Sequence, residues 1–257
     1  MNGQDMNQRL QEAYADWKRS LQFAEDDAAQ YAAQLSPPLL LSVPPGYTEA
    51  DRRILFFGQE TFGWEWTRKL REDYPQYQVD YPYTDVSTLQ DFLANDDSVE
   101  ALCWAYREFK FAEYQPTNRW SPFWKAFKEV QRWRGVGLIW NNLSRCDFQG
   151  GSVLSAPKAL QTYLAECQRG LVAKELEILR PHVCLFFTGP GYDNLLSGVF
   201  PECSFTLVVK DIPVRQLARI GHPRLPANSF RTYHPSYLSR GRHWDFIKHL
   251  SKLSESR

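Results

Sequence analysis

The sequence predicts an α/β fold in which helices cover both faces of a mostly parallel β-sheet. Short segments that are apolar throughout alternate with longer amphipathic segments, and continuous apolar runs are typical of parallel strands buried on both faces. The chain has 257 residues, of which 43% are hydrophobic and 23% are charged. This length and composition suit one large globular domain, or two small ones, with a substantial core.

The first 46 residues are expected to form a helical extension, and residues 47–257 the main domain. Leu10, Tyr14 and Trp17 follow helical spacing within residues 7–34, which predicts an amphipathic helix there. Prolines at positions 37, 38, 44 and 45 then end the helical pattern, because proline cannot continue a helix. The extension is expected to pack on or cap the main domain.

The main domain is expected to begin with a buried strand at residues 54–57. Residues 85–113 and 121–134 have largely helical patterns, and Ser121 followed by Pro122 is typical of a helix start, since serine caps the first turn and proline fits within it. The remaining expected elements are, in chain order, a strand at 137–140, a helix at 157–179, strands at 181–188, 204–209 and 229–233, and a helix at 239–253. Such alternation favours a parallel sheet with helices on both faces.

The chain has no formal net charge, which argues against broad, non-specific coating of nucleic acid. The charge is uneven, because residues 211–257 hold nine basic and three acidic side chains (net +6), whereas residues 1–50 hold three basic and seven acidic ones (net −4). No apolar run approaches the roughly 20 residues that span a bilayer, and the N-terminal residues lack a signal-peptide pattern. We expect a monomeric cytoplasmic protein without a membrane partner.

Several cofactor classes lack support in the sequence. The five cysteines include no Cys-x-x-Cys pair, so no metal site is predicted, and an odd count without a secretion signal indicates reduced thiols. The sequence also lacks the Gly-x-Gly-x-x-Gly and Walker motifs that would support a nucleotide cofactor. It lacks the Gly-x-Ser-x-Gly elbow of α/β-hydrolases as well.

Polar and turn-forming residues follow four of the expected strands. These residues are Gln59 and Glu60, Asn141 and Asn142, Gly189, and His234. Because the carboxyl ends of parallel strands meet at one edge of a sheet, where ligands bind, we expect these side chains to form a site.

Each candidate allows a functional and a structural interpretation. Glu60 can act as a general base or stabilise a developing cation, or it can balance a helix dipole. His234 can donate to an oxyanion or make a structural hydrogen bond. The amide of Asn141, or of its competitor Asn142, can read the edge of a nucleobase or belong to a turn. Phe62 and the tryptophans after it can form a wall for a flat base or pack in the core.

Two segments resemble the signature motifs of the uracil-DNA glycosylase superfamily. Residues 58–62 (Gly-Gln-Glu-Thr-Phe) resemble G-Q-D-P-Y, and residues 234–239 (His-Pro-Ser-Tyr-Leu-Ser) resemble H-P-S-x-L-S. Residues 138–141 resemble the family's base-binding Asn segment, and residues 183–189 resemble its hydrophobic strand with a terminal glycine loop. The resemblance spans residues 53–242 and implies a three-layer α/β/α sandwich with a short parallel central sheet.

The resemblance implies a monofunctional DNA glycosylase that flips a base out of DNA and hydrolyses its N-glycosidic bond without a cofactor. The roles it implies by position are catalysis by Glu60 (water positioning) and His234 (stabilising the leaving base), base binding by Gln59, Phe62 and Asn141, and DNA contacts by Gly189, Ser236, Leu238, Ser239, Arg240 and Arg242. Leu238 would be the wedge that fills the gap in the duplex, although it can equally pack under its own loop.

Three departures from the family pattern change the expected substrate. Glu60 replaces the usual Asp, and Thr61 and Gly63 replace Pro and His of the main uracil-removing family. Gly63 leaves more room, so we expect a modified or damaged pyrimidine, such as a bulky 5-substituted cytosine of phage DNA, rather than only uracil. A non-catalytic protein that binds nucleic acid or a nucleobase on the same fold is the alternative, and an enzyme acting on a free nucleoside or nucleotide is a third class.

Overall fold

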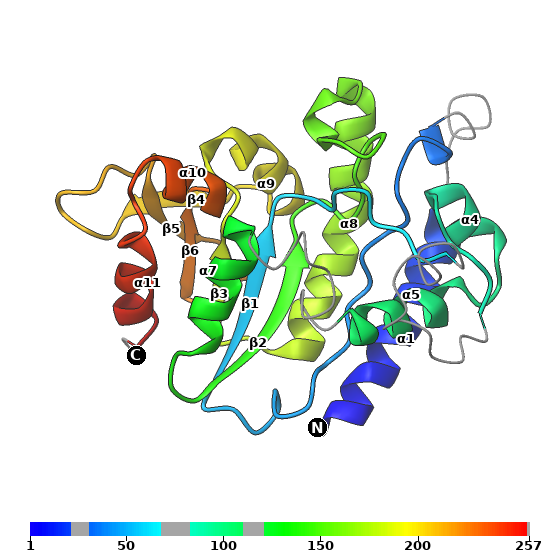
Figure 1. Cartoon of the computed structure of the whole chain (residues 1–257), viewed down its shortest axis with the longest axis horizontal. Helices are drawn as coiled ribbons and strands as arrows, with labels where there is room; N and C mark the ends of the chain where they lie inside the picture. Colours follow the sequence, from blue (N-terminus) through cyan, green and yellow to red (C-terminus); the bar gives the residue numbers. More distant parts are fainter. Residues whose placement is uncertain (22–30, 68–82, 110–120, 256–257) are drawn as a thin grey trace.

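The computed structural model describes residues 1–21, 31–67, 83–109 and 121–255. Its centre is a six-stranded sheet with the order β2-β1-β3-β6-β5-β4 (Figure 1). The strands are β1 Arg52–Gly58, β2 Val136–Asn142, β3 Val183–Phe186, β4 Ser204–Leu207, β5 Leu217–Gly221 and β6 Asn228–Thr232. The strands β2, β1, β3 and β6 run parallel, while β5 and β4 are antiparallel. The sheet is therefore mixed and mostly parallel, as expected.

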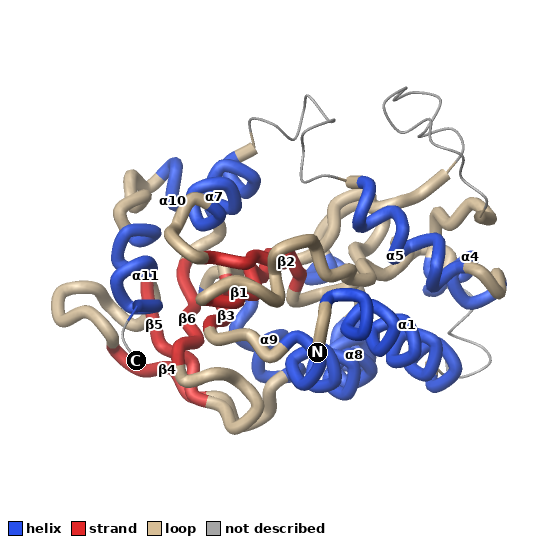
Figure 2. The backbone as a smooth tube through the Cα atoms, turned by 90° about the horizontal axis from the view of Figure 1, so that it is seen from below, coloured by secondary structure: helices blue, strands red, loops and turns tan. Residues whose placement is uncertain are grey.

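Helices cover both faces of this sheet, which confirms the predicted α/β sandwich. Figure 2 shows α7, α10 and α11 on one side of the strands and α8 and α9 on the other. The α-helices are α1 Gly3–Ser20, α4 Leu89–Ala94, α5 Ser98–Glu108, α7 Pro122–Gln131, α8 Lys158–Leu179, α9 Asp193–Val199, α10 Pro235–Arg240 and α11 Phe246–Glu255, and short 3₁₀ turns are η3 Val153–Ser155 and η4 Pro190–Tyr192. Across the described ranges, none of the helices combines the length and apolar character needed to cross a bilayer.

The strand β2 is longer than its apolar run predicts. The apolar residues end at Trp140, but Asn141 and Asn142 continue the strand because they pair with Phe57 and Gly58 at the end of β1. Consecutive side chains of a strand point to opposite faces. Because Asn141 and Asn142 both belong to β2, their side chains face opposite layers of the fold.

The C-terminal part differs most from the expected elements. The strand β5 was not predicted, because Arg219 interrupts its short apolar sequence. The helix expected at residues 239–253 is instead the pair α10 and α11, separated near Arg242, whose φ of 56° is incompatible with a continuous right-handed helix. The helix start at Ser121 is confirmed, since its side chain accepts a hydrogen bond from the backbone N–H of Trp124.

The N-terminal helix shares the core of the main domain. The helix α1 is shorter than the predicted span of residues 7–34, because it ends at Ser20, and residues 22–30 lie outside the described part of the chain. Its Tyr14 is fully buried, donates its hydroxyl to Glu175 of α8 at 2.8 Å, and accepts from the backbone N–H of Leu41 at 3.0 Å. The first 46 residues thus contribute buried side chains to the same hydrophobic cluster as the sheet.

Candidate active site at the carboxyl edge of the sheet

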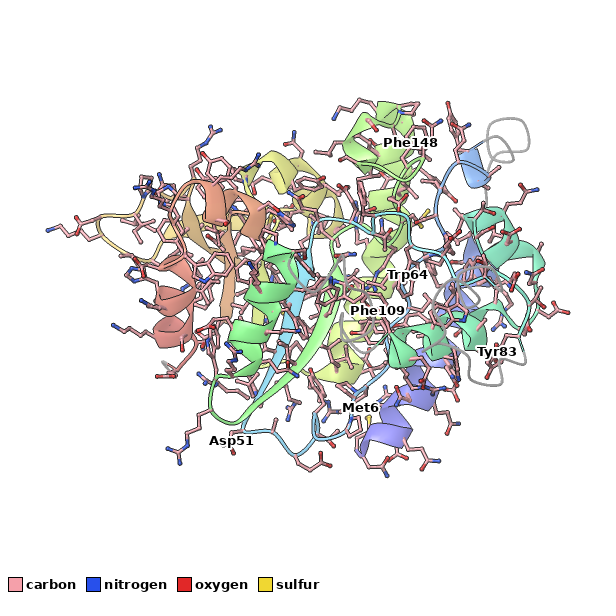
Figure 3. The ribbon with its side chains drawn as sticks, in the orientation of Figure 1. Met6, Asp51, Trp64, Tyr83, Phe109 and Phe148 are labelled. Atoms are coloured by element: carbon pink, nitrogen blue, oxygen red, sulfur yellow. The ribbon has the colours of Figure 1, made fainter. Side chains whose placement is uncertain are left out.

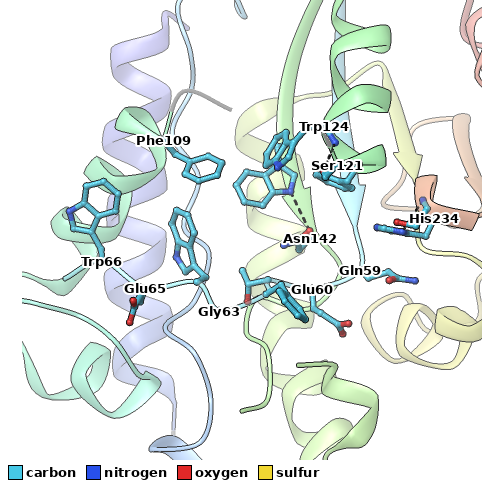
Figure 4. Close-up of a pocket in the computed structure, with 16 residues that line it drawn as sticks. Gln59, Glu60, Gly63, Glu65, Trp66, Phe109, Ser121, Trp124, Asn142 and His234 are labelled. Carbon is cyan, nitrogen blue, oxygen red and sulfur yellow. Dashed lines mark hydrogen bonds between the residues drawn. The ribbon is translucent and has the colours of Figure 1, made fainter. Parts of the chain in front are cut away.

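A cavity of about 450 Å³ lies at the carboxyl ends of β1 and β2 (Figure 4). It is lined by residues from the segment after β1, from α5, α7 and β2, and from the start of α10. These residues are Gln59, Glu60, Thr61, Phe62, Gly63, Trp64, Glu65, Trp66, Phe109, Ser121, Phe123, Trp124, Trp140, Asn142, His234 and Ser236. In Figure 4, Gln59 and His234 lie toward one end of the cavity and Phe109 and Trp66 toward the other, with Asn142 between them.

The Glu60 carboxylate is held by groups from two distant loops. Its Oε1 accepts from the Tyr192 hydroxyl at 2.5 Å, and its Oε2 accepts from the backbone N–H of Val153 at 3.2 Å. Burial raises the pKa of Glu60, and the hydrogen bonds from Tyr192, Val153 and Ser152 partly offset that rise. A fixed carboxylate with a raised pKa is suited to general-base chemistry.

His234 is a neutral hydrogen-bond donor at neutral pH. It is the N-cap of α10, where its Nδ1 accepts from the backbone N–H of Ser236 at 3.3 Å. Its ring stacks on Phe123, with centroids 5.9 Å apart and an interplanar angle of 13°. Burial, together with the nearby Arg240, lowers the pKa of His234 to about 4. Because Nδ1 accepts, the single proton of the neutral ring is on Nε2.

Asn141 does not reach the cavity, which corrects its expected role in base binding. It is fully buried on the opposite face of the sheet, where its Nδ2 donates to Glu175 at 3.4 Å and its Oδ1 accepts from the backbone N–H of Asn142 at 2.7 Å. Asn142 has the next side chain along the strand, so it faces the cavity. Asn142, the competing candidate to Asn141 in the sequence, therefore lies where an amide that contacts the base was expected.

The amide oxygen of Asn142 is engaged by the protein, whereas its NH₂ group is a buried donor. The indole N–H of Trp140, which can only donate, bonds to Asn142 Oδ1 at 3.3 Å (Figure 4). The Asn142 side chain is 1% exposed, and its Nδ2 has no hydrogen-bond partner within the described residues. Gly58 leaves room for this arrangement, because a Cβ there would lie 2.4 Å from Asn142 Oδ1. The site thus offers a buried donor to a ligand acceptor.

Aromatic rings form the far end of the cavity. Trp64 meets Phe109 edge-on with centroids 5.6 Å apart, and it meets Trp140 edge-on at 6.1 Å. Figure 3 shows Trp64 and Phe109 side by side. Phe62, which was expected to shape the pocket, lines the cavity but is 84% exposed. The enclosed wall is therefore made by the tryptophans and Phe109, while Phe62 is a largely exposed ring at this site.

Leu238 is fully buried, which contradicts its expected role as an exposed wedge. It lies in α10, which turns this side chain into the core and leaves the preceding Tyr237 47% exposed, with its ring tilted by 38° against that of Tyr233 at a centroid distance of 4.3 Å. The large aromatic side chain that α10 presents outward is therefore Tyr237. Tyr237 directly precedes Leu238 in the same H-P-S-x-L-S segment. From the sequence, Leu238 was expected to be the wedge because it is an apolar residue among polar neighbours.

The other predicted DNA contacts differ in their surroundings. Ser239, Arg240 and Arg242 are exposed, whereas Ser236 is half-buried and lines the cavity. Gly189, with φ of 74°, donates its N–H to the carbonyl of Thr232 at 2.9 Å and so joins the ends of β3 and β6.

Gln59 lines the cavity and is fixed by the end of β3. Its Nε2 donates to the carbonyl of Thr188 at 2.7 Å. One of the two N–H groups of its amide is therefore engaged with the protein, and its Oε1 can accept from a ligand.

Tyr192 is a site residue that sequence reasoning missed. It lies at the end of η4, far along the chain from Glu60, and its hydroxyl contacts both Glu60 and Ser152, the latter at 2.9 Å. No local pattern marks this tyrosine, and the only available signal was its place just after the Gly189 turn. Burial and the Glu60 charge raise the pKa of Tyr192, so its hydroxyl stays protonated and donates to the carboxylate.

The comparisons with known proteins leave the family open. No protein-family model matches the chain, and no curated protein matches it. Within the described residues, no group of three or more His, Cys, Asp or Glu side chains is placed to hold a metal ion. The case for any function therefore rests on the motif residues and on the geometry of this cavity.

Proposed function

We propose that the protein is a monofunctional DNA glycosylase that flips out a base, hydrolyses its N-glycosidic bond and leaves an abasic site. The observation that carries the proposal is that the Glu60 carboxylate, the neutral His234 and the donor amide of Asn142 line one cavity. Cleavage of an N-glycosidic bond builds positive charge on the sugar and negative charge on the base. Glu60 would orient water and stabilise the sugar cation, and His234 Nε2–H would stabilise the leaving base.

The proposed substrate is a modified or damaged pyrimidine with a bulky 5-substituent, such as those of phage DNA. The cavity extends from Asn142 to Trp64 and Phe109, and it is large enough for more than a small flat ring. Gly63 has a φ of 64°, and no other heavy atom of the described residues lies within 4 Å of the place where a Cβ would stand, which leaves room beside it. The hydroxyl of Thr61, which also lines the cavity, contacts the Ser36 hydroxyl at 3.1 Å.

One observation favours the binding-only alternative. Both oxygens of Glu60 already accept hydrogen bonds, from Tyr192 and from Val153, which can hold the carboxylate as a structural group. A protein of this kind would flip or bind a base without breaking the bond.

A panel of duplexes tests the proposal directly. Purified protein is incubated with duplexes that carry uracil, 5-hydroxymethylcytosine or its glucosylated form, and abasic sites are measured. We expect abasic sites from at least one modified cytosine. Abasic sites from uracil alone would contradict the modified-base proposal, and DNA binding without abasic sites on any duplex would support the binding-only alternative.

Replacing Asn142 with Asp should lower kcat/KM for base release about 10²-fold or more. The change replaces the buried NH₂ donor with an oxygen that can accept a hydrogen bond or carry a negative charge. The base then loses one hydrogen bond in a site that excludes water. The measurement is single-turnover base release. The matched control is Asn141→Asp, which is buried outside the cavity and should reduce stability more than base selectivity. If the two variants lost base release equally when compared at the same fraction of folded protein, the proposed contact between Asn142 and the base would be contradicted.

Replacing Tyr192 with Phe should move the acidic limb of the pH–activity profile to higher pH. The tyrosine hydroxyl stabilises the charged form of Glu60 and so lowers its pKa. Its removal raises that pKa, and activity that needs the carboxylate is lost as pH falls through it. The profile of kcat/KM against pH measures the shift. If the acidic limb stayed at the same pH and activity fell by the same factor at every pH, Tyr192 would support the fold of the site without changing the pKa of Glu60.

A further inference from the structure

Trp64 lines the cavity, and its indole N–H is a buried donor that has no partner among the described residues. Trp64 is 8% exposed, and its Nε1 makes no hydrogen bond within the described residues. An unsatisfied buried donor carries a free-energy penalty that native structures rarely retain without reason. The acceptor that completes this site is therefore expected to come from a bound ligand.

The donor belongs to the same cavity as the base-reading amide. Trp140 connects the two, because its indole N–H binds Asn142 Oδ1 and its ring meets the edge of Trp64. The neighbouring Trp124 also packs edge-on against Trp140 at 4.9 Å. Two residues that line the cavity, Asn142 and Trp64, thus each hold a buried N–H donor that has no partner among the described residues.

Resting on the proposed function, we propose that the Trp64 end is a second subsite for a hydroxylated, sugar-like ring attached to the base. Oxygen atoms of such a ring accept from Trp64 Nε1, and its C–H faces pack against the rings of Phe109 and Trp124. An aliphatic substituent would fill the space but leave the indole donor unsatisfied. An unmodified base would occupy only the Asn142 end.

Replacing Trp64 with Phe tests this subsite, because phenylalanine keeps an aromatic ring and removes the N–H. We expect kcat/KM for the glucosylated 5-hydroxymethylcytosine duplex to fall roughly 10-fold or more relative to the 5-hydroxymethylcytosine duplex. The control is Trp17→Phe, since the Trp17 indole donates to the Cys167 carbonyl outside the cavity. That variant should affect both duplexes equally.

A binding measurement separates this inference from the proposed function. The Kd values of both duplexes are measured for wild type and for Trp64→Phe, with or without base release. Selective weakening of the glucosylated duplex supports the subsite even if no base is released, whereas the absence of base release alone would count against the glycosylase. Equal Kd and kcat/KM ratios for wild type and Trp64→Phe would overturn the subsite while leaving the glycosylase intact.

Discussion

Replacing Glu60 with Gln should lower the rate of base release by about 10²- to 10⁴-fold while leaving DNA affinity nearly unchanged. The substitution keeps the size of the side chain but removes the charge that, in the proposed mechanism, activates water and stabilises a sugar cation. Glutamine has one amide oxygen, which can accept from the backbone N–H of Val153, while its NH₂ group can donate to the Tyr192 hydroxyl oxygen, so both neighbours that hold the carboxylate in the native protein keep a partner. The measurement is single-turnover base release, with duplex binding measured in parallel.

The control for this prediction is Glu166→Gln on the exposed face of α8. It makes the same chemical change far along the chain from the site and should leave base release unchanged. If Glu60→Gln released the base as fast as wild type, the carboxylate would be a structural group, as its engagement by Tyr192 and Val153 allows. Loss of both binding and base release would instead indicate that the variant is misfolded, which circular dichroism distinguishes.

Replacing Arg145 with Met should lower the free energy of unfolding by about 3–5 kcal/mol, because it leaves a buried carboxylate without its cation. Arg145 pairs with Glu175, and both side chains are 1% exposed. Burial raises the pKa of Glu175, while Arg145, Tyr14 and Asn141 stabilise its charged form. Denaturant unfolding measures the loss.

The exposed pair between Arg132 and Glu129 supplies the control for the buried pair. Its side chains are 76% and 47% exposed, and Arg132→Met should change the free energy of unfolding by less than about 1 kcal/mol because solvent screens such pairs. A similar small loss for Arg145→Met would contradict the assigned role of the buried pair. The Glu175 network also holds Asn141, which in turn accepts from the backbone N–H of Asn142, so it supports the strand end that carries Asn142, the proposed base-binding residue.

The sequence alone predicted those helices and strands that are determined by one local pattern. The apolar run of β1, the capped start of α7 and the long amphipathic α8 were all predicted, and the structure contains them. The convergence of Glu60 and His234 on one cavity followed from the rule that parallel strands share a carboxyl edge.

The remaining features depend on register and on contacts between distant residues. Which asparagine faces the cavity is set by pairing of β2 with β1, because a shift of one residue exchanges the two faces. The burial of Leu238 depends on the orientation of α10 against the core. Tyr192 reaches Glu60 only in the folded chain, and the lack of a partner for the Trp64 indole N–H among the described residues follows from the packing around that side chain rather than from any motif.

Mass spectrometry of the products tests the glycosylase proposal most directly. A duplex with a single glucosylated 5-hydroxymethylcytosine is incubated with the native protein, and both the strand and the released small molecule are weighed. We predict an unbroken strand that has lost the modified base and gained a hydroxyl at that sugar, together with the free base. A strand of unchanged mass, measured while the protein is bound to the duplex, would contradict the proposed hydrolysis of this substrate. The same result with the uracil and 5-hydroxymethylcytosine duplexes would contradict glycosylase chemistry as a whole.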